Sequence, residues 1–220
     1  MDQDMPRDPV ALGNVVIAFV YVSLAADLLY TLTCIYQLAR FSGLDTAQPA
    51  SVAMDQLDGP AALLIAAIGI AFIVVGMLTW IIACRWIYRV NRNAHLFSDW
   101  MTMTPGWNII WFFVPVAGLY LPFQGVLQSW QASHAPDDPA SVPVPPLLRW
   151  WWGLWIVTGL LGSASLRLGT RSDTVGGMMF SNWVDVATLF ADVPLAILFI
   201  TLIRRLSAAQ ADAMRARMFE

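Results

Sequence analysis

Two carboxylates lie where a membrane-spanning chain rarely places a charge. Asp27 falls near the middle of the apolar stretch 10–39, and Asp192 near the middle of the apolar stretch 183–203. An ionised carboxylate at the bilayer centre costs about 2.5–3.5 kcal/mol on insertion scales, so such acids are candidates for proton or cation sites. Asp185 lies seven residues before Asp192, on the same helix side. These acids indicate either proton-coupled transport or a polar clamp that holds helices together.

A group of arginines could bind an anion. Arg85, Arg89 and Arg92 have the spacing i, i+4, i+7 and therefore share one helix face, and Asn93 follows directly. A basic amphipathic helix at a membrane surface suits anionic lipid headgroups, at about 1 kcal/mol per arginine. The alternative is that these are the ordinary basic residues of a cytoplasmic loop.

Aromatic residues near these arginines could contact a lipid as well. Trp107 and Trp111 belong to the strongly aromatic stretch 107–130, and Arg149 opens the stretch 147–168. An aromatic wall beside an arginine face fits a lipid headgroup and upper acyl chain, and the alternative is packing with interface anchoring. The predicted contact residues for an anionic lipid or a partner membrane protein are Arg85, Arg89, Arg92, Asn93, Arg149, Trp107 and Trp111.

Other chemistries lack the residues that they need. His95 and His134 are the only histidines, and neither has a cysteine or carboxylate at ligand spacing, so no metal site is expected. No serine lies in a G-x-S-x-G setting, and there is no glycine-rich phosphate loop. A formal net charge of −3 excludes a generally basic nucleic-acid binder.

The elements that must position these residues are long apolar helices. The 220 residues are 58% hydrophobic and 12% charged, against about 25% charged in a soluble domain. Several apolar stretches approach or exceed the roughly 20 residues that a spanning helix needs. The sequence predicts an all-α polytopic bundle with an acidic tail (1–9), one membrane domain (10–206) and a cytoplasmic helical tail (207–220). Its predicted spans are about 10–39, 61–84, 147–168 and 183–203.

The stretch 107–130 decides the topology. Pro115 and Pro122 each remove an amide donor and Gly118 lies between them, so the stretch should bend between two half-length helical segments. If it crosses the bilayer there are five spans, and the twelve arginines divide equally between the two faces. If it is a re-entrant or interfacial segment there are four spans, and nine arginines share one face. The arginine bias of cytoplasmic loops favours four spans with both termini in the cytoplasm, and five spans remain the alternative.

The segments between the spans are predicted as loops. Residues 43–59 are polar, residues 129–146 are rich in proline and should form a stiff, partly extended linker, and residues 169–182 are rich in glycine. An interfacial aromatic belt is predicted where the span 147–168 begins, because indole prefers the headgroup level. Its members are Trp150, Trp151, Trp152 and Trp155.

A spaced set of arginine, proline and tryptophan positions runs through residues 81–154. It consists of Arg-Trp-Ile-Tyr-Arg with Asn93 (85–93), Pro-Gly-Trp (105–107), Phe-Val-Pro (113–115), Pro-Phe-Gln (122–124), Trp130 and Trp-Trp-Trp (150–152). The first and last spans, with Gln210, match more loosely. This set resembles a bacterial membrane family classed as a domain of unknown function. The resemblance implies a multi-span bacterial membrane protein with no established activity.

These observations predict a non-enzymatic accessory or scaffold protein of the bacterial cytoplasmic membrane, without a cofactor. It would engage anionic lipid, a partner membrane protein or a second copy of itself. The alternative is a small proton- or cation-coupled transporter that uses Asp27 and Asp192.

Overall fold

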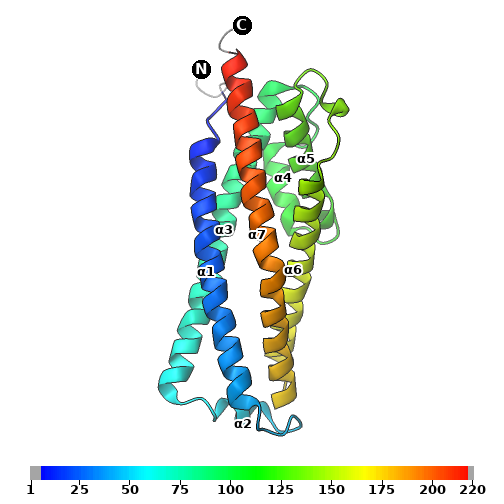
Figure 1. The fold of residues 1–220 in the computed structure, drawn as a ribbon. Helices are drawn as coiled ribbons and strands as arrows, with labels where there is room; N and C mark the ends of the chain where they lie inside the picture. The colour runs from blue at the N-terminus through cyan, green and yellow to red at the C-terminus, as the bar shows by residue number, and fades with distance from the viewer. Residues whose placement is uncertain (1–5, 218–220) are drawn as a thin grey trace. The chain divides into compact units, whose positions relative to one another are not determined.

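The computed structural model describes residues 6–217, and within this range the chain is built from helices (Figure 1). The α-helices of the described chain are α1 (Val10–Phe41), α2 (Ala50–Met54), α3 (Gly59–Phe97), α4 (Pro105–Ile110), α5 (Leu121–His134), α6 (Pro146–Arg171) and α7 (Val175–Arg217). Short 3₁₀ helices η1, η2 and η3 cover Trp111–Phe113, Ala117–Leu119 and Pro139–Ser141. The predicted all-α fold class is confirmed. The outer ends of both predicted tails, 1–5 and 218–220, lie outside the described residues.

Three helices are long and apolar enough to cross a membrane: α1, α3 and α7. In the most apolar part of α3 no residue is buried inside the protein, which leaves that part free to contact lipid. The helix α6 spans 26 residues but falls outside this group, since tryptophan, glycine, serine and arginine make up much of it.

The described chain divides into two compact units. Unit 1 comprises residues up to 20, residues 78–152 and residues from 197 onward, and unit 2 comprises 21–77 and 153–196. The long helices α1, α3, α6 and α7 each contribute to both units. Every site described below lies within one unit.

The interior of unit 1 is aromatic. Trp86 of α3 is fully buried, and its ring meets Phe199 of α7 edge to face at a centroid distance of 6.2 Å. Phe199 also stacks on Trp151 of α6 at 5.7 Å. Trp151 and Trp152 are only 3% and 7% exposed. The prediction that both belong to an interfacial belt is therefore wrong, because they fill the interior, whereas Trp150 is exposed.

In unit 2 two predicted loops contain helix. The polar stretch 43–59 includes α2, which packs through Ala53 against Phe41 and Val175. The glycine-rich stretch 169–182 is mostly helical, because α6 continues to Arg171 and α7 begins at Val175. The backbone N–H of Ala50 donates to the Asp173 carbonyl at 2.9 Å, so these two connections support each other.

The segment between α3 and α6 is sharply bent. The parts Pro105–Phe113 and Ala117–His134 meet at 113° across a short break (Figure 1). At the break the N–H of Ala117 donates to the Pro115 carbonyl at 2.7 Å, and the intervening Val116 has φ 65° and ψ −58°. This is a classic γ-turn, a rare and strained conformation.

Gly118 and Pro122 have different roles at this bend. Gly118 is buried, and a Cβ on it would lie 2.8 Å from the carbonyl oxygen of Trp111, so only glycine fits. Pro122 is in the first turn of α5, where proline is tolerated. The prediction of two half-length helical segments is wrong for the second one, because α5 is 14 residues long and extends to His134, into the start of the predicted linker.

The two ends of the bent segment meet. Residues Phe97–Trp100, before α4, and Pro136–Ala140, after α5, line one pocket of about 420 Å³. The segment therefore returns to the side of unit 1 from which it started.

Candidate functional site

The strongest candidate site is a pocket of about 650 Å³ in unit 1, which we call the arginine pocket. Its cationic side chains are Arg7, Arg85, Arg89 and Arg92. Its apolar side chains are Leu12, Trp80, Ile81, Ile109, Ile110 and Phe113, and Cys84, Tyr88, Asn93 and Gly106 complete the lining. Among the described residues that line it, none is acidic. A pocket of this volume is in the range of small-ligand sites.

The first wall of the pocket is the C-terminal part of α3. From Trp80 to Asn93 this wall extends about 20 Å along the helix axis, at about 1.5 Å per residue. It begins with the apolar Trp80 and Ile81, and the three arginines follow. The opposite side of the same helix is buried through Ile87 and Ala94, so the arginine side is directed outward. The wall therefore changes from apolar to cationic along its length.

The second wall comes from α4. Pro105 begins this helix, and Ile109 and Ile110 extend from it into the lining. Phe112 holds the segment against α3, because its ring meets Trp80 edge to face at 5.0 Å. Ile110 and Phe113 are 48% and 68% exposed, so the apolar part of the pocket is open to the surroundings.

The third wall is the segment before α1. Asn93 holds this segment through the backbone of Arg7: its Oδ1 accepts from the Arg7 N–H at 3.0 Å, and its Nδ2 donates to the Arg7 carbonyl at 2.8 Å. Arg89 donates from Nη1 to the Asp8 carbonyl at 3.1 Å. The Asp8 carboxylate accepts from the N–H of Val10 at 2.8 Å, at the start of α1. The side chain of Arg7 lines the same pocket as the α3 arginines.

A buried hydrogen-bond network supports Asn93. Its Nδ2 also donates to Oε1 of Gln210 in α7 at 3.0 Å, and Gln210 is fully buried. The Nε2 of Gln210 donates to the Val90 carbonyl at 2.7 Å and to the Ser133 hydroxyl at 3.1 Å. This network ties α3, α5, α7 and the N-terminal segment together behind the pocket.

A comparison of the sequence with known protein families identifies the family of this chain. Residues 50–208 match the family described as a domain of unknown function, DUF4328. The chain belongs to the DUF4328 family. The match includes the whole stretch 81–154 that carries the resemblance noted in the sequence, and it includes two of the three pocket walls. No curated protein and no solved structure matches the chain.

The DUF4328 chain brings together four of the seven predicted contact residues. Arg85, Arg89, Arg92 and Asn93 all line the arginine pocket. Trp107 and Trp111 stack on each other at 5.2 Å and do not line it. Arg149, exposed at the start of α6, does not line it either.

Two residues that matter for this DUF4328 site were not predicted from the sequence. Arg7 is 86 positions from Asn93, and no local pattern joins them. Gln210 was noted only as part of the resemblance.

The predicted intramembrane acids of the DUF4328 chain lie together in unit 2. The side chains of Asp27 and Asp192 lie near enough to interact with each other. Asp185 accepts a hydrogen bond from the Tyr30 hydroxyl at 3.1 Å, and Tyr30 stacks on Phe72 at 4.8 Å. Within the described chain no three His, Cys, Asp or Glu side chains are placed to hold a metal ion.

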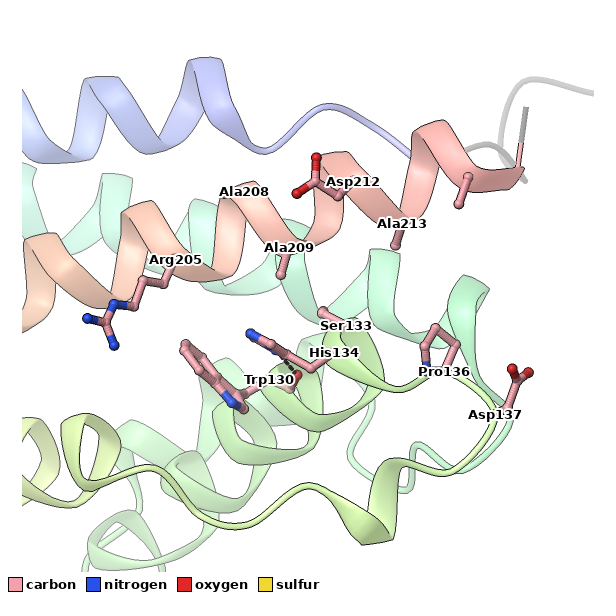
Figure 2. A pocket seen from close by; sticks show the side chains of 11 residues that line it. Trp130, Ser133, His134, Pro136, Asp137, Arg205, Ala208, Ala209, Asp212 and Ala213 are labelled. Atoms are coloured by element: carbon pink, nitrogen blue, oxygen red, sulfur yellow. Dashed lines mark hydrogen bonds between the residues drawn. The ribbon is translucent and has the colours of Figure 1, made fainter. Parts of the chain in front are cut away.

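A second pocket of unit 1, of about 820 Å³, lies between α5 and α7 (Figure 2). Its lining includes Trp130, His134, Arg205 and Asp212. The imidazole of His134 stacks on Trp130 at 4.2 Å, and its Nδ1 lies 2.8 Å from the Trp130 carbonyl, as Figure 2 shows. A carbonyl only accepts, so Nδ1 is the donor in this contact. Charges of both signs line this pocket, so it favours no ligand class.

Proposed function

We propose that this chain is a non-enzymatic membrane protein that holds an anionic lipid in the arginine pocket. The observation that carries the proposal is the change from apolar to cationic lining within one pocket. A lipid needs this combination, since its headgroup is charged and its acyl chain is apolar. A partner protein with an acidic segment would use the arginines but would leave the apolar part without an equivalent contact.

The charge of the pocket is suited to an anion. Four arginines and no acidic side chain are found among the described lining residues, and arginine stays charged at every physiological pH. Guanidinium groups bind phosphate oxygens with paired, charge-assisted hydrogen bonds. Exposed Ile110 and Phe113 provide an apolar exit along which an acyl chain can reach the bilayer.

The proposed setting is the bacterial cytoplasmic membrane, with four spans and both termini in the cytoplasm. Support comes from the bent segment, whose two ends line one pocket, and from the nine arginines that then share the cytoplasmic face. In this arrangement α6 is the fourth span. Cysteine labelling at Asp99 and Asp137 tests it: both labels should react from the cytoplasmic side, and reaction from opposite sides would exclude it.

Lipid binding is tested by native mass spectrometry of the protein in nanodiscs of phosphatidylglycerol or phosphatidylcholine. The variant has Arg85, Arg89 and Arg92 replaced by Gln. At about 1 kcal/mol per arginine, its affinity for phosphatidylglycerol should fall about a hundredfold. The matched control replaces Arg149, Arg167 and Arg171, which lie outside the pocket, by Gln and should bind normally. Equal losses in the two variants would contradict the proposal.

A second candidate function is a proton-coupled carrier, and the proximity of Asp27 and Asp192 supports it. Two carboxyl groups can hydrogen-bond only when one of them carries a proton, so the pair is a place where a proton can reside. The test replaces each Asp by Asn, which keeps a hydrogen-bonding side chain. A folded variant that no longer moves protons in proteoliposomes would favour the carrier, and a variant that no longer folds would favour a clamp between helices.

A further inference from the structure

The arginines of the pocket approach a bound headgroup from more than one direction. Arg85, Arg89 and Arg92 extend from one helix, whereas Arg7 belongs to a separate segment that Asn93 fixes through the backbone. A flat row of arginines on a single helix would contact only one side of a phosphate. Arg7 adds a cation from a second segment of the chain to the same pocket.

Two of these guanidinium groups are available for a ligand. Within residues 6–217, those of Arg7 and Arg85 make no hydrogen bond and no ion pair, and both residues are exposed. Arg89 uses one nitrogen to hold the Asp8 carbonyl, so its remaining N–H groups stay available. The positive charge of the pocket therefore exceeds what one negative charge can balance.

We propose that the ligand is a lipid whose headgroup ends in a phosphomonoester or a diphosphate. This inference rests on the proposed lipid-binding function and narrows it to one headgroup class. A phosphodiester lipid such as phosphatidylglycerol carries a single negative charge, and its phosphate is substituted on both sides. A terminal phosphate carries close to two negative charges and presents three free oxygens, which suits donors that come from two segments of the chain.

The contribution of Arg7 is specific to this class. With a phosphodiester, the α3 arginines can satisfy the single charge, and Arg7 adds little. With a terminal phosphate, Arg7 can pair with the oxygen that faces away from α3. One added charge-assisted hydrogen bond corresponds to about tenfold in affinity.

The test is calorimetric titration of the detergent-solubilised full chain with dioctanoyl phosphatidic acid, phosphatidylglycerol and phosphatidylcholine. At about pH 7.5, phosphatidic acid should bind about tenfold more tightly than phosphatidylglycerol. The second phosphate ionisation lies near pH 6, so at about pH 5 phosphatidic acid becomes a monoanion and the preference should disappear. The titratable lining groups are the four arginines, Tyr88 and Cys84, and the ordinary pKa values of these types lie above this range, so the change belongs to the ligand.

Two variants locate the effect. Arg7→Gln should lower the affinity for phosphatidic acid about tenfold more than the affinity for phosphatidylglycerol, so that the preference disappears, and Arg149→Gln should retain the preference. Equal binding of both anionic lipids at about pH 7.5 would overturn this inference and leave the proposed function intact. Binding of neither above the level of phosphatidylcholine would overturn both. If inorganic diphosphate binds as tightly as phosphatidic acid, the conclusion that the bound phosphate belongs to a lipid is excluded.

Discussion

Asn93 and Arg7 are joined by a pair of hydrogen bonds, at 3.0 and 2.8 Å, although 86 positions separate them in the chain. The carboxamide of Asn93 uses both its oxygen and its nitrogen on the backbone of Arg7, in the way that a neighbouring strand would. Its second N–H reaches Gln210, so every polar atom of this buried side chain has a partner. The arginine pocket therefore depends on an amide that links its own helix, α3, to the N-terminal segment and to α7.

Replacing Asn93 by Ala should lower the free energy of unfolding by about 2–3 kcal/mol, because three hydrogen bonds are lost and buried partners remain unsatisfied. The matched variant Arg7→Ala keeps the backbone groups that Asn93 holds, so its stability should match the parent. Thermal unfolding in detergent measures both. Equal stability of the Asn93 variant and the parent would show that the N-terminal segment is not held in this way.

Replacing Gly125 by Ala should destabilise the packing of α4 on α5. A Cβ at this position would overlap the side-chain amide of Asn108, which is fully buried and has little room to move. A loss of about 1–3 kcal/mol is expected. The control is Gly153→Ala in α6, where nothing lies within 4 Å of an added Cβ and the higher helix propensity of alanine should leave stability equal or raised. Urea or thermal unfolding compares the two, and equal effects would contradict the packing.

Replacing Tyr30 by Phe tests the contact with Asp185 alone. The phenylalanine ring keeps the stack on Phe72 and loses only the hydroxyl that donates at 3.1 Å. Hydrogen bonds between membrane helices average about 0.6 kcal/mol, so a loss of this size is expected. Tyr30→Ala also removes the stack and should cost about 1 kcal/mol more. If both variants cost the same, the stack contributes nothing.

Replacing Val116 by Gly should stabilise the protein. Valine at φ 65° is strained, and relief of about 1–3 kcal/mol exceeds the backbone entropy of glycine, about 0.5–1 kcal/mol. The net gain should be about 1 kcal/mol. Val114, with φ −96°, is unstrained, so Val114→Gly should instead lower the melting temperature. A lower melting temperature for the Val116 variant would exclude the γ-turn.

Much of the helical architecture could be predicted from apolar length and proline positions. The prediction that the glycine-rich stretch 169–182 is a loop was wrong, because glycine at these positions allows segments to pack closely against each other. An added Cβ on Gly169 would lie 3.1 Å from Ser181 Oγ, and one on Gly176 would lie 3.1 Å from Thr46. Glycine is tolerated inside membrane helices for this reason, and only the fold shows which use applies.

Of the residues that form the candidate site, only those on the α3 wall could be predicted from the sequence. Spacing alone places Arg85, Arg89 and Arg92 on one face of α3, because helical periodicity is local. The presence of Arg7 in the same pocket is not predictable, since its position depends on a contact between distant segments. Composition likewise could not distinguish Trp151 and Trp152, which are buried, from Trp150, which is exposed.

Asn93 contacts residue 7 through its backbone alone, so this contact does not depend on which side chain stands at position 7. Asn93 lies within the part of the chain that matches the family, and Arg7 lies outside it. The side chain at position 7 can therefore change from one protein to another without loss of the anchor. A lysine, a glutamate or an aromatic residue there would present different chemistry to the same cavity, so this position is where one scaffold could acquire a new ligand.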